Sequence, residues 1–487
     1  MRFTEVLGLI SDILIGWEME GDPEVEDVEL HSDRVKKGDL FICRKGEKFD
    51  SHRVAKEVVE KGARALICER EVGRVGVPVA IVSDSRVAEA LLAREFYGDP
   101  ARKMLVIGVT GTNGKTTTVH MIHYILKNLG MTGGMISTVY NEILGDRDKT
   151  DNTTPGALYI FRAMDRILKG GGSYMVMEVS SHAIAMKRVH TVRFDVASLL
   201  NVTRDHLDFH GSFEEYKRTK FRIFDLLKPD GIGIINSEFL EDFKGKPFKK
   251  LFYGRDFWVE RIGVSLEGTC FDLVSGSFRK RICMKAIGDF NALNGAFAVF
   301  SLHSIGFDLD EVSEALEGFK GVEGRFERIR EAEKAGYRVI VDFAHSPDAL
   351  EKVLENARRL IDGRGRVILV FGAGGHADKG KREIMGRVAQ QLADISIVTN
   401  DDPRGENPEE IIADILKGFS ESKKPLVLQD RREAIETAIT LASKRDIIVI
   451  AGRGHEEFQI FSESKIVPFK DSEVVREIVS RKVGRKK

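Results

Sequence analysis

The 487-residue sequence lacks the features that would place it in a membrane or in an oxidising compartment. No window reaches the roughly 18 uncharged apolar residues that a bilayer-spanning helix needs. Residues 1–20 carry acids within their apolar portion and have no basic start, unlike a signal peptide. The four cysteines form no CxxC pair, which argues against a disulfide framework and a thiolate zinc site. We therefore expect reduced thiols, a cytoplasmic location and no membrane partner.

An excess of either charge is also missing. The formal net charge is −1, so the chain as a whole has no attraction for nucleic acid or for acidic lipid. With 42% hydrophobic and 31% charged residues, the composition is that of an ordinary globular protein. The length exceeds what one hydrophobic core supports and predicts about three domains.

The most informative motif is GTNGKTT at residues 111–117. It follows an apolar run at 104–109 and precedes an amphipathic run at 119–129, which predicts a strand, a glycine loop and a helix. In that order they form a phosphate cradle, with Lys115 reaching the outer phosphates and Thr116 offering a hydroxyl to Mg²⁺. The longer pattern GxxxxGK[ST] fails because Val109 stands where it requires glycine. A turn that only caps a helix would not explain Lys115, so we predict ATP binding.

Alternating apolar and helical segments predict an α/β protein of three domains, at residues 1–99, 100–326 and 327–487. The predicted strands include 39–43, 65–68, 104–109, 174–178, 196–200, 233–235, 338–342, 367–371, 395–399 and 447–451. The predicted helices include 52–61, 119–129, 158–168, 213–227, 291–305, 348–360, 381–392 and 408–419. An antiparallel section is expected at 254–281. The GAGG cluster at 372–375 does not have the GxGxxG spacing of a dinucleotide fingerprint.

Polar residues follow two of the predicted central strands. Glu178 ends one strand, and the segment 201–210, NVTRDHLDFH, follows the next. Parallel strands end at one edge of a sheet, where ligands bind, so Glu178, His206 and Thr116 are predicted to meet there. Oxygen ligands suit Mg²⁺, and a magnesium ion beside phosphates predicts phosphoryl transfer. Taken singly, Glu178 could be a helix-capping acid and His206 a structural histidine.

With these residues the sequence resembles the Mur ligases, the ATP-dependent amide-forming enzymes of bacterial cell-wall precursor synthesis. The motifs occur in order along nearly the whole chain: SDRV at 32–35 with GDLF at 38–41, GTNGKTT, DNTTP at 151–155, EVSSH at 178–182, NVTRDHLDFHG at 201–211, Tyr216-x-x-x-Lys220, DFNxxN at 289–294, Gly324-Arg325, DFAHSP at 342–347, DDPR at 401–404 and GRGHE at 452–456. Such a series does not arise by chance.

The resemblance implies a small N-terminal α/β uridine-binding domain, a central P-loop-type parallel-sheet ATPase domain and a C-terminal Rossmann-like doubly wound domain that binds the amino acid. The set is most similar to the member that attaches a diamino acid to the D-glutamate of UDP-N-acetylmuramoyl-L-alanyl-D-glutamate. The reaction would use ATP and Mg²⁺ and pass through an acyl phosphate. The partners would be the UDP-N-acetylmuramoyl dipeptide and a free diamino acid, with no nucleic acid, and we expect a monomer.

The resemblance also implies residue roles. ATP would contact Gly111, Thr112, Asn113, Gly114, Lys115, Thr116, Thr117, Asn291, Asn294, Arg325, Asp342 and His345. Catalysis would involve Lys115, Glu178, His206 and Lys220, with Mg²⁺ ligands Thr116, Glu178, His206 and Lys220. The UDP-sugar peptide would contact Ser32, Thr153, Thr154, Ser180 and Arg188. The incoming amino acid would contact Asp401, Asp402, Pro403, Arg404, Gly452 and Glu456.

Lys220 matches the lysine that in this family reacts with CO₂ to become a carbamate, N6-carboxylysine. That reaction turns a cation into an anion able to bind a second Mg²⁺. Without the resemblance, Lys220 would be interpreted as a solvated helical lysine.

The added amino acid is predicted from two departures from the family pattern. Members that use meso-diaminopimelate usually carry DNPR and a GxRDKGKR-like run, whereas this chain has DDPR and HADKGKR at 376–382. Asp402 thus replaces an amide and Ala377 a cation, and both changes should make the pocket more negative. We therefore favour lysine. Arg404 still suits a second carboxylate, so meso-diaminopimelate remains the alternative.

Three other functions would account for part of these motifs. Folylpolyglutamate synthetase shares the GTNGK loop but lacks the N-terminal uridine-binding unit and would show GKGS. A non-catalytic ATP-binding switch or scaffold would not need the acid and histidine cluster. A small-molecule P-loop kinase is disfavoured by the absence of glycine at position 109.

Overall fold

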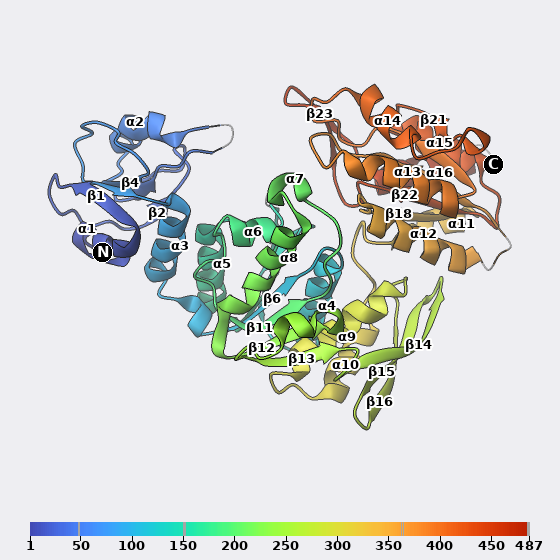
Figure 1. The fold of residues 1–487 in the computed structure, drawn as a ribbon, viewed down its shortest axis with the longest axis horizontal. Helices are drawn as coiled ribbons and strands as arrows, with labels where there is room; N and C mark the ends of the chain where they lie inside the picture. The colour runs from blue at the N-terminus through green and yellow to red at the C-terminus, as the bar shows by residue number, and fades with distance from the viewer. Residues whose placement is uncertain (47–48, 150–151, 362, 364, 485–487) are drawn as a thin grey trace. The chain divides into compact units, whose positions relative to one another are not determined.

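The computed structural model describes residues 1–46, 49–149, 152–361, 363 and 365–484 (Figure 1). It divides into two compact units. The first comprises Met1–Thr110, Gly130–Ala197 and Thr219–Gly233, and the second comprises Gly111–Leu129, Ser198–Arg218 and Ile234–Lys487. Across the described residues, no helix is both long enough and apolar enough to cross a membrane. The division into three domains is not tested by these units and stays a prediction.

The N-terminal part of the first unit is a five-stranded sheet in the order β1-β5-β4-β3-β2. Its elements are α1 (Phe3–Leu9), β1 (Leu14–Glu18), β2 (Val28–Glu29), β3 (Leu40–Ile42), α2 (Ala55–Glu60), β4 (Ala65–Cys68), β5 (Val79–Val82) and α3 (Ser85–Phe96). The strands β2 to β5 are parallel, and β1 pairs antiparallel with β5. Helix α3 begins where the Asp84 side chain accepts hydrogen bonds from two backbone N–H groups, as an N-cap does.

The central sheet has eight strands in the order β13-β12-β11-β6-β10-β7-β8-β9. Its elements and the neighbouring helices are β6 (Leu105–Thr110), α4 (Lys115–Asn128), β7 (Gly133–Ile136), β8 (Asn141–Ile143), β9 (Asp146–Asp148), α5 (Ala157–Lys169), β10 (Tyr174–Glu178), α6 (Ser181–Ala185), β11 (Phe194–Leu199), α7 (Leu207–His210), α8 (Phe213–Phe221), β12 (Leu227–Asn236) and β13 (Lys249–Tyr253). The strands β6, β10 and β7 are parallel, and Glu178 pairs with Val109 in the register of β10 and β6. Glu178 therefore ends its strand level with the residue that precedes Thr110 and the glycine loop.

The second unit includes an antiparallel sheet, β14 (Trp258–Ser265), β15 (Gly268–Ser275) and β16 (Phe278–Met284), beside α9 (Phe290–His303) and α10 (Leu309–Glu317). The predicted antiparallel section is confirmed. The prediction that all four cysteines are reduced is wrong for two of them, because Cys270 and Cys283 form a disulfide. They face each other across β15 and β16, a juxtaposition that the sequence spacing did not reveal. Cys43 and Cys68 are free and buried.

The C-terminal part of the second unit contains a six-stranded sheet in the order β17-β18-β22-β19-β20-β21 and a two-stranded one, β23-β24. The strands are β17 (Glu327–Arg328), β18 (Arg338–Asp342), β19 (Val367–Phe371), β20 (Ile395–Val398), β21 (Leu426–Val427), β22 (Ile447–Ala451), β23 (Phe458–Ser462) and β24 (Lys465–Pro468). The helices are α11 (Arg330–Lys334), α12 (Pro347–Ile361), α13 (Gly380–Leu392), α14 (Pro408–Leu416), α15 (Arg431–Leu441) and α16 (Asp471–Gly484). Apart from β17, the larger sheet is parallel, as expected for the doubly wound fold.

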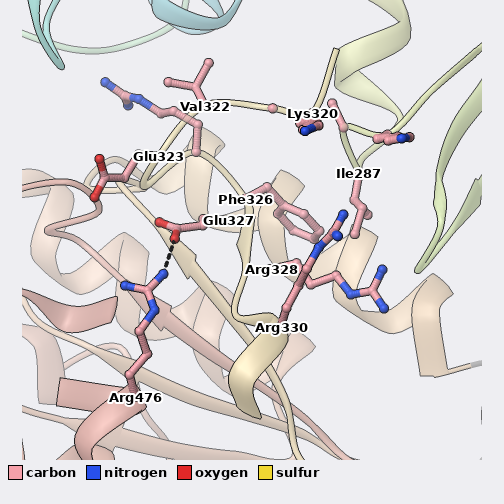
Figure 2. A pocket seen from close by; sticks show the side chains of 13 residues that line it. Ile287, Lys320, Val322, Glu323, Phe326, Glu327, Arg328, Arg330 and Arg476 are labelled. Atoms are coloured by element: carbon pink, nitrogen blue, oxygen red, sulfur yellow. Dashed lines mark hydrogen bonds and ion pairs between the residues drawn. The ribbon is translucent and has the colours of Figure 1, made fainter. Parts of the chain in front are cut away.

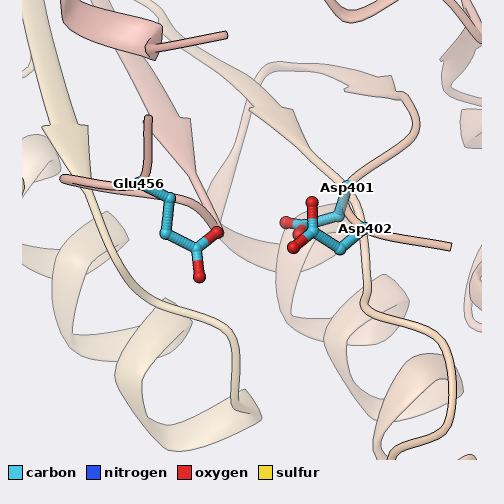
Figure 3. Close-up of side chains that lie close together, drawn as sticks. All are labelled: Asp401, Asp402 and Glu456. Atoms are coloured by element: carbon cyan, nitrogen blue, oxygen red, sulfur yellow. The ribbon is translucent and has the colours of Figure 1, made fainter. Parts of the chain in front are cut away.

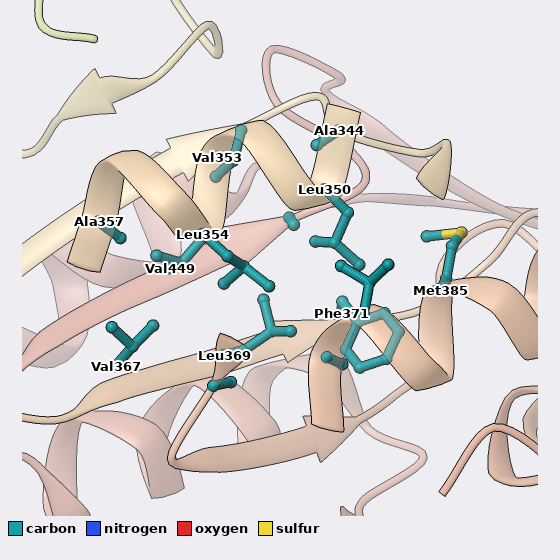
Figure 4. Packing of buried hydrophobic residues seen from close by; sticks show 14 of the residues in the cluster. Ala344, Leu350, Val353, Leu354, Ala357, Val367, Leu369, Phe371, Met385 and Val449 are labelled. Carbon is teal, nitrogen blue, oxygen red and sulfur yellow. The ribbon is translucent and has the colours of Figure 1, made fainter. Parts of the chain in front are cut away.

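Both faces of this larger sheet are covered. In β19, Val367, Leu369 and Phe371 belong to the hydrophobic cluster that includes α12 and α13 residues, shown in Figure 4. Ile368 and Val370 point to the opposite cluster, which includes residues of α15 and α16. Successive strand residues point to opposite faces, so a strand covered on both sides must be apolar throughout. This requirement explains why its strands could be recognised as uninterrupted apolar runs.

Replacement of Leu369 by alanine is predicted to destabilise this part of the chain by about 2–5 kcal/mol, because it removes a fully buried side chain and leaves a cavity. Calorimetry of the thermal transition should detect the loss. Leu426→Ala is the matched control, since Leu426 is 44% exposed. Equal destabilisation by the two replacements would contradict this account of the core.

Candidate active site

The phosphate loop connects β6 to α4 and lies in the second unit. Its lysine folds back onto the loop, because Lys115 Nζ donates to the carbonyl oxygens of Gly111 at 2.9 Å and Thr112 at 2.8 Å. Gly114 has φ +88°, and a Cβ atom there would lie 2.5 Å from Asn294 Oδ1. Glycine is therefore required at position 114 both by its conformation and by the close approach of Asn294.

The segment after β11 holds the loop in place. Asn201 is bonded to both sides of Asn113: its Oδ1 accepts from Asn113 N at 2.9 Å, and its Nδ2 donates to Asn113 O at 3.1 Å. The Thr112 hydroxyl donates to Thr203 O and accepts from Thr203 N. The Tyr216 hydroxyl lies 3.0 Å from the same Thr112 oxygen. These bonds fix the backbone whose N–H groups would face a phosphate.

Residues predicted to contact the nucleotide surround this loop within the second unit. Arg325 Nη2 donates to Thr116 Oγ1 at 3.2 Å, and its guanidinium stacks over the Phe343 ring. On α9, Asn294 Nδ2 donates to Asn291 Oδ1 at 3.3 Å. The structure thus brings Thr116 together with Arg325, and Gly114 together with Asn294, as a shared nucleotide site would require.

Asp342 ends β18 and is buried. Burial raises its pKa to about 6, although its oxygens accept backbone hydrogen bonds from Phe326 N and Ala344 N. It therefore fixes the turn into the C-terminal part, in addition to any contact with a ligand.

His206 lies just after β11 in the left-handed region, at φ +53°, with Nε2 3.4 Å from Asp205 Oδ2. Burial alone would raise the pKa of Asp205, but the charges of His345, His206 and Lys381 lower it below its usual value. Burial, together with the charge of Lys381, lowers the pKa of His345. Asp205 is therefore an ionised carboxylate among cationic and imidazole groups.

Glu178 lies in the first unit, fully buried at the end of β10. Its carboxylate accepts from the backbone N–H of Thr138 at 2.7 Å and from the Thr138 hydroxyl. The Thr138 hydroxyl oxygen also lies 3.2 Å from the Thr153 hydroxyl oxygen, within hydrogen-bond distance. Thr138 thus links Glu178, a predicted metal ligand, to Thr153, a predicted substrate contact.

Further substrate contacts predicted from the motifs lie beside Glu178. The Thr154 hydroxyl donates to Glu178 O at 2.8 Å and accepts from Ser180 N at 3.1 Å. Arg188 Nη1 donates to Thr154 O at 2.9 Å. The structure therefore brings Thr153, Thr154, Ser180 and Arg188 together, whereas Ser32 lies in the N-terminal sheet region, where its carbonyl accepts from Lys61 Nζ.

Lys220 is on α8 and only 2% exposed. The interpretation of Lys220 as a solvated helical lysine is therefore wrong, because the helix turns this position inward. Glu178 and Lys220 belong to the first unit, whereas Thr116 and His206 belong to the second. Their joint coordination of magnesium stays a prediction.

Three of the six residues predicted to bind the incoming amino acid, Asp401, Asp402 and Glu456, form an acidic cluster in the second unit (Figure 3). Asp401, Asp402 and Glu456 each place a carboxylate oxygen within 4.8 Å of the others. Asp401 Oδ2 is buried and accepts no hydrogen bond from any described residue. Burial, reinforced by the charges of the two aspartates, raises the pKa of Glu456 to about 8. The cation of the cluster is the buried Arg453, whose Nη1 contacts Asp402 and lies 3.5 Å from Glu456 and 4.0 Å from Asp401.

The interpretation of Asp402 as added negative charge needs correction. Asp402 Oδ1 accepts hydrogen bonds from the fully buried Arg453 and from Ile460 N. Arg404, whose side chain is 51% exposed, lies 3.5 Å from the other Asp402 oxygen. Because Arg453 pairs most closely with Asp402, the acceptor that remains for a further cation is the unsatisfied Asp401 Oδ2.

Several residues of this region were not predicted from the sequence. Asp348, on α12, accepts a hydrogen bond from Asn113 Nδ2 at 2.7 Å and so links α12 to the phosphate loop. The position of Asp205 within the polar segment after β11 was the one sequence feature that could have indicated its role. Arg453 stood inside the GRGHE motif, but only the structure shows its contact with Asp402.

Comparison with known proteins identifies the class. Three family models match the chain: "Mur ligase family, catalytic domain" at residues 24–97, "Mur ligase middle domain" at 109–302 and "Mur ligase, glutamate ligase domain" at 324–454. Relatives named UDP-N-acetylmuramoyl-L-alanyl-D-glutamate–2,6-diaminopimelate ligase include one from Clostridium botulinum, 37% identical over 94% of this chain and 96% of its own length. Another, from Aquifex aeolicus, is 38% identical over 93% and 94%.

Solved structures agree. A ligase of the same name has a TM-score of 0.65 at 30% identity and covers 94% of this chain and 95% of its own. The MurF ligase of Thermotoga maritima in complex with ADP has a TM-score of 0.69 at 23% identity, covering 95% and 99%, which supports the fold. The chain belongs to the Mur ligase family, whose members form amide bonds with ATP. The predicted family, fold class and enzyme class are confirmed.

Replacement of Lys115 by alanine is expected to lower kcat by at least about 10²–10³, because it removes the cation that offsets phosphate charge. The release of phosphate in the presence of all substrates measures the loss. Lys127→Ala is the control, since Lys127 is exposed near the end of the same helix. Full turnover by the Lys115 variant would contradict the nucleotide site.

Proposed function

We propose that this protein joins a diamino acid to the D-glutamate of UDP-N-acetylmuramoyl-L-alanyl-D-glutamate with the hydrolysis of ATP to ADP and phosphate. The nearly full-length relatives named for this reaction support the dipeptide substrate. The observation that carries the amine side is Asp401 Oδ2, a buried oxygen without a donor beside Glu456. A substrate ammonium group would supply that donor. The reaction places the protein in the cytoplasm, where ATP is available.

The chemistry has two steps. A carboxylate oxygen of the substrate attacks the γ-phosphorus of ATP, and ADP leaves, which gives an acyl phosphate. The neutral amine then attacks the acyl carbon, and the tetrahedral intermediate expels phosphate. Lys115 would exchange the carbonyl oxygens of Gly111 and Thr112 for phosphate oxygens, and so reduce the repulsion between the two anions.

Magnesium would bind to Thr116, Glu178 and His206, and a second ion to carbamylated Lys220. The residues fit this role, because the Glu178 carboxylate has acceptor capacity beyond its bonds from Thr138. The ion would supply positive charge at the phosphates. At Lys220, which is only 2% exposed, a carbamate would replace the ammonium cation by an anion able to bind the metal.

We propose lysine as the amino acid that is added, and meso-diaminopimelate is the alternative. The unsatisfied Asp401 oxygen and Glu456 favour a free ammonium group at the far end of the substrate. The relatives are named for diaminopimelate, and the exposed Arg404 could receive its second carboxylate. Lysine lacks that carboxylate and places only the ammonium in the acidic cluster.

Purified enzyme is therefore expected to use lysine with a higher kcat/KM than meso-diaminopimelate. Steady-state rates with L-lysine, D-lysine and meso-diaminopimelate, at saturating ATP and dipeptide, measure the preference. A clear preference for meso-diaminopimelate would refute lysine but leave the ligase assignment intact.

The affinity for the diamino acid is expected to rise with pH up to about 8. Below the Glu456 pKa of about 8, Glu456 is protonated in the empty pocket, so binding an ammonium group must release its proton. Apparent KM should therefore fall by up to about tenfold per pH unit below pH 8 and then level. Glu456→Gln should remove the part of the pH dependence of KM that comes from Glu456. The ionisation of the attacking amine still affects both enzymes equally. Identical KM profiles for both would exclude the role of Glu456.

A further inference from the structure

A cavity of about 310 Å³ opens beside residues 320–330 in the second unit (Figure 2). Its lining comes from both sides of the junction between the regions that match the middle-domain and the glutamate-ligase models. Six cationic residues line it, and we name it the cationic pocket after them: Lys285, Lys320, Arg325, Arg328, Arg330 and Arg476. Two acids, Glu323 and Glu327, also line it. This balance contrasts with the nearly neutral chain.

Both acids of the pocket already have cationic partners. Glu327 pairs with Arg476 at 3.2 Å, the contact drawn in Figure 2, and also accepts a hydrogen bond from Gly324 N. Glu323 pairs with Lys470, which does not line the pocket. The two acids therefore offer little compensation to the other cations.

Three of the six cations of the pocket are not paired with an acidic side chain of the described residues. Lys285, Lys320 and Arg330 are exposed, and no carboxylate of the described residues lies within ion-pair distance of them. Arg328, by contrast, pairs with Glu333. In Figure 2, Arg328 and Arg330 extend to the side of the pocket opposite Arg476. Like charges held around one cavity repel one another, and a bound anion would relieve that repulsion.

The cationic pocket is distinct from the proposed nucleotide site. Asn291, Asn294, Asp342 and His345 do not line it. Arg325 does line it, and it also donates to Thr116 Oγ1. The two sites therefore adjoin at one guanidinium group but differ in their other residues.

We propose that the cationic pocket binds a small multivalent oxyanion, of the diphosphate or tricarboxylate class. A volume of 310 Å³ corresponds to about ten water molecules, which is room for such an anion with part of its hydration shell. Guanidinium groups match the oxygens of phosphate and carboxylate alike, and the lysines add point charges. The bound anion would contact residues before and after the junction, since Lys285 and Lys320 precede it and Arg328 and Arg330 follow it.

The test uses the full-length protein in a metal-free buffer. It carries Lys115→Ala, which weakens anion binding at the phosphate loop. Calorimetric titration with inorganic pyrophosphate and, separately, with citrate should show one saturable site for at least one anion. The tighter probe identifies the diphosphate or the tricarboxylate class. Lys320→Ala with Arg330→Ala should weaken binding at least tenfold, and so should added salt.

The control replaces two exposed cations away from the pocket, Lys424→Ala and Arg387→Ala, and should leave the affinity unchanged. Lys320→Ala with Arg330→Ala in the otherwise wild-type enzyme should keep its ligase turnover, which shows that it folds and separates this site from the proposed function. No saturable binding of either probe, or equal binding by the pocket and control variants, would overturn the proposal.

Discussion

The hydrogen bonds between Asn201 and Asn113 are the constraint on which the candidate site depends. They join the phosphate loop to the segment after β11 through both the backbone N–H and the carbonyl group of Asn113. The same segment continues to Asp205 and His206, so one short stretch fixes the loop and carries a predicted metal ligand. The sheet topology allows this arrangement. The strands β11, β6 and β10 follow one another in the sheet, and polar residues follow the carboxyl end of each.

Charge is distributed along the chain to match what each part would hold. The loop offers Lys115 and backbone N–H groups, which suit phosphates. The C-terminal cluster offers Asp401 and Glu456, which suit an amine. An amide-forming ligase needs this separation of charge. Carboxylates that attract the ammonium group of the amino acid would repel the phosphates if both stood in one place. The two requirements explain why a nearly neutral chain contains sites of opposite sign.

The sequence predicted strands such as β19 because a strand covered on both faces must be apolar throughout, and it predicted β10 because that strand is apolar up to its last residue, Glu178. It predicted the phosphate loop because only certain residues fit its geometry, such as glycine at position 114 against Asn294. It failed where a contact joins distant residues. The Cys270–Cys283 disulfide depends on the register of β15 and β16, and the burial of Lys220 depends on which way α8 faces. Neither follows from local pattern.

Asp402 shows why a substitution in a motif cannot be converted directly into pocket charge. An aspartate in place of asparagine adds a negative charge, yet here Arg453 lies fully buried against that carboxylate. A buried arginine needs a closely paired carboxylate, and Asp402 is the carboxylate nearest to Arg453, so its charge is offset within the protein. Asp401, with its unsatisfied oxygen, retains the capacity to bind a cation. If these residues hold the incoming amino acid as proposed, its choice would depend on the balance between the Asp401 and Glu456 carboxyl groups and the exposed Arg404, rather than on the residue that distinguishes the motif.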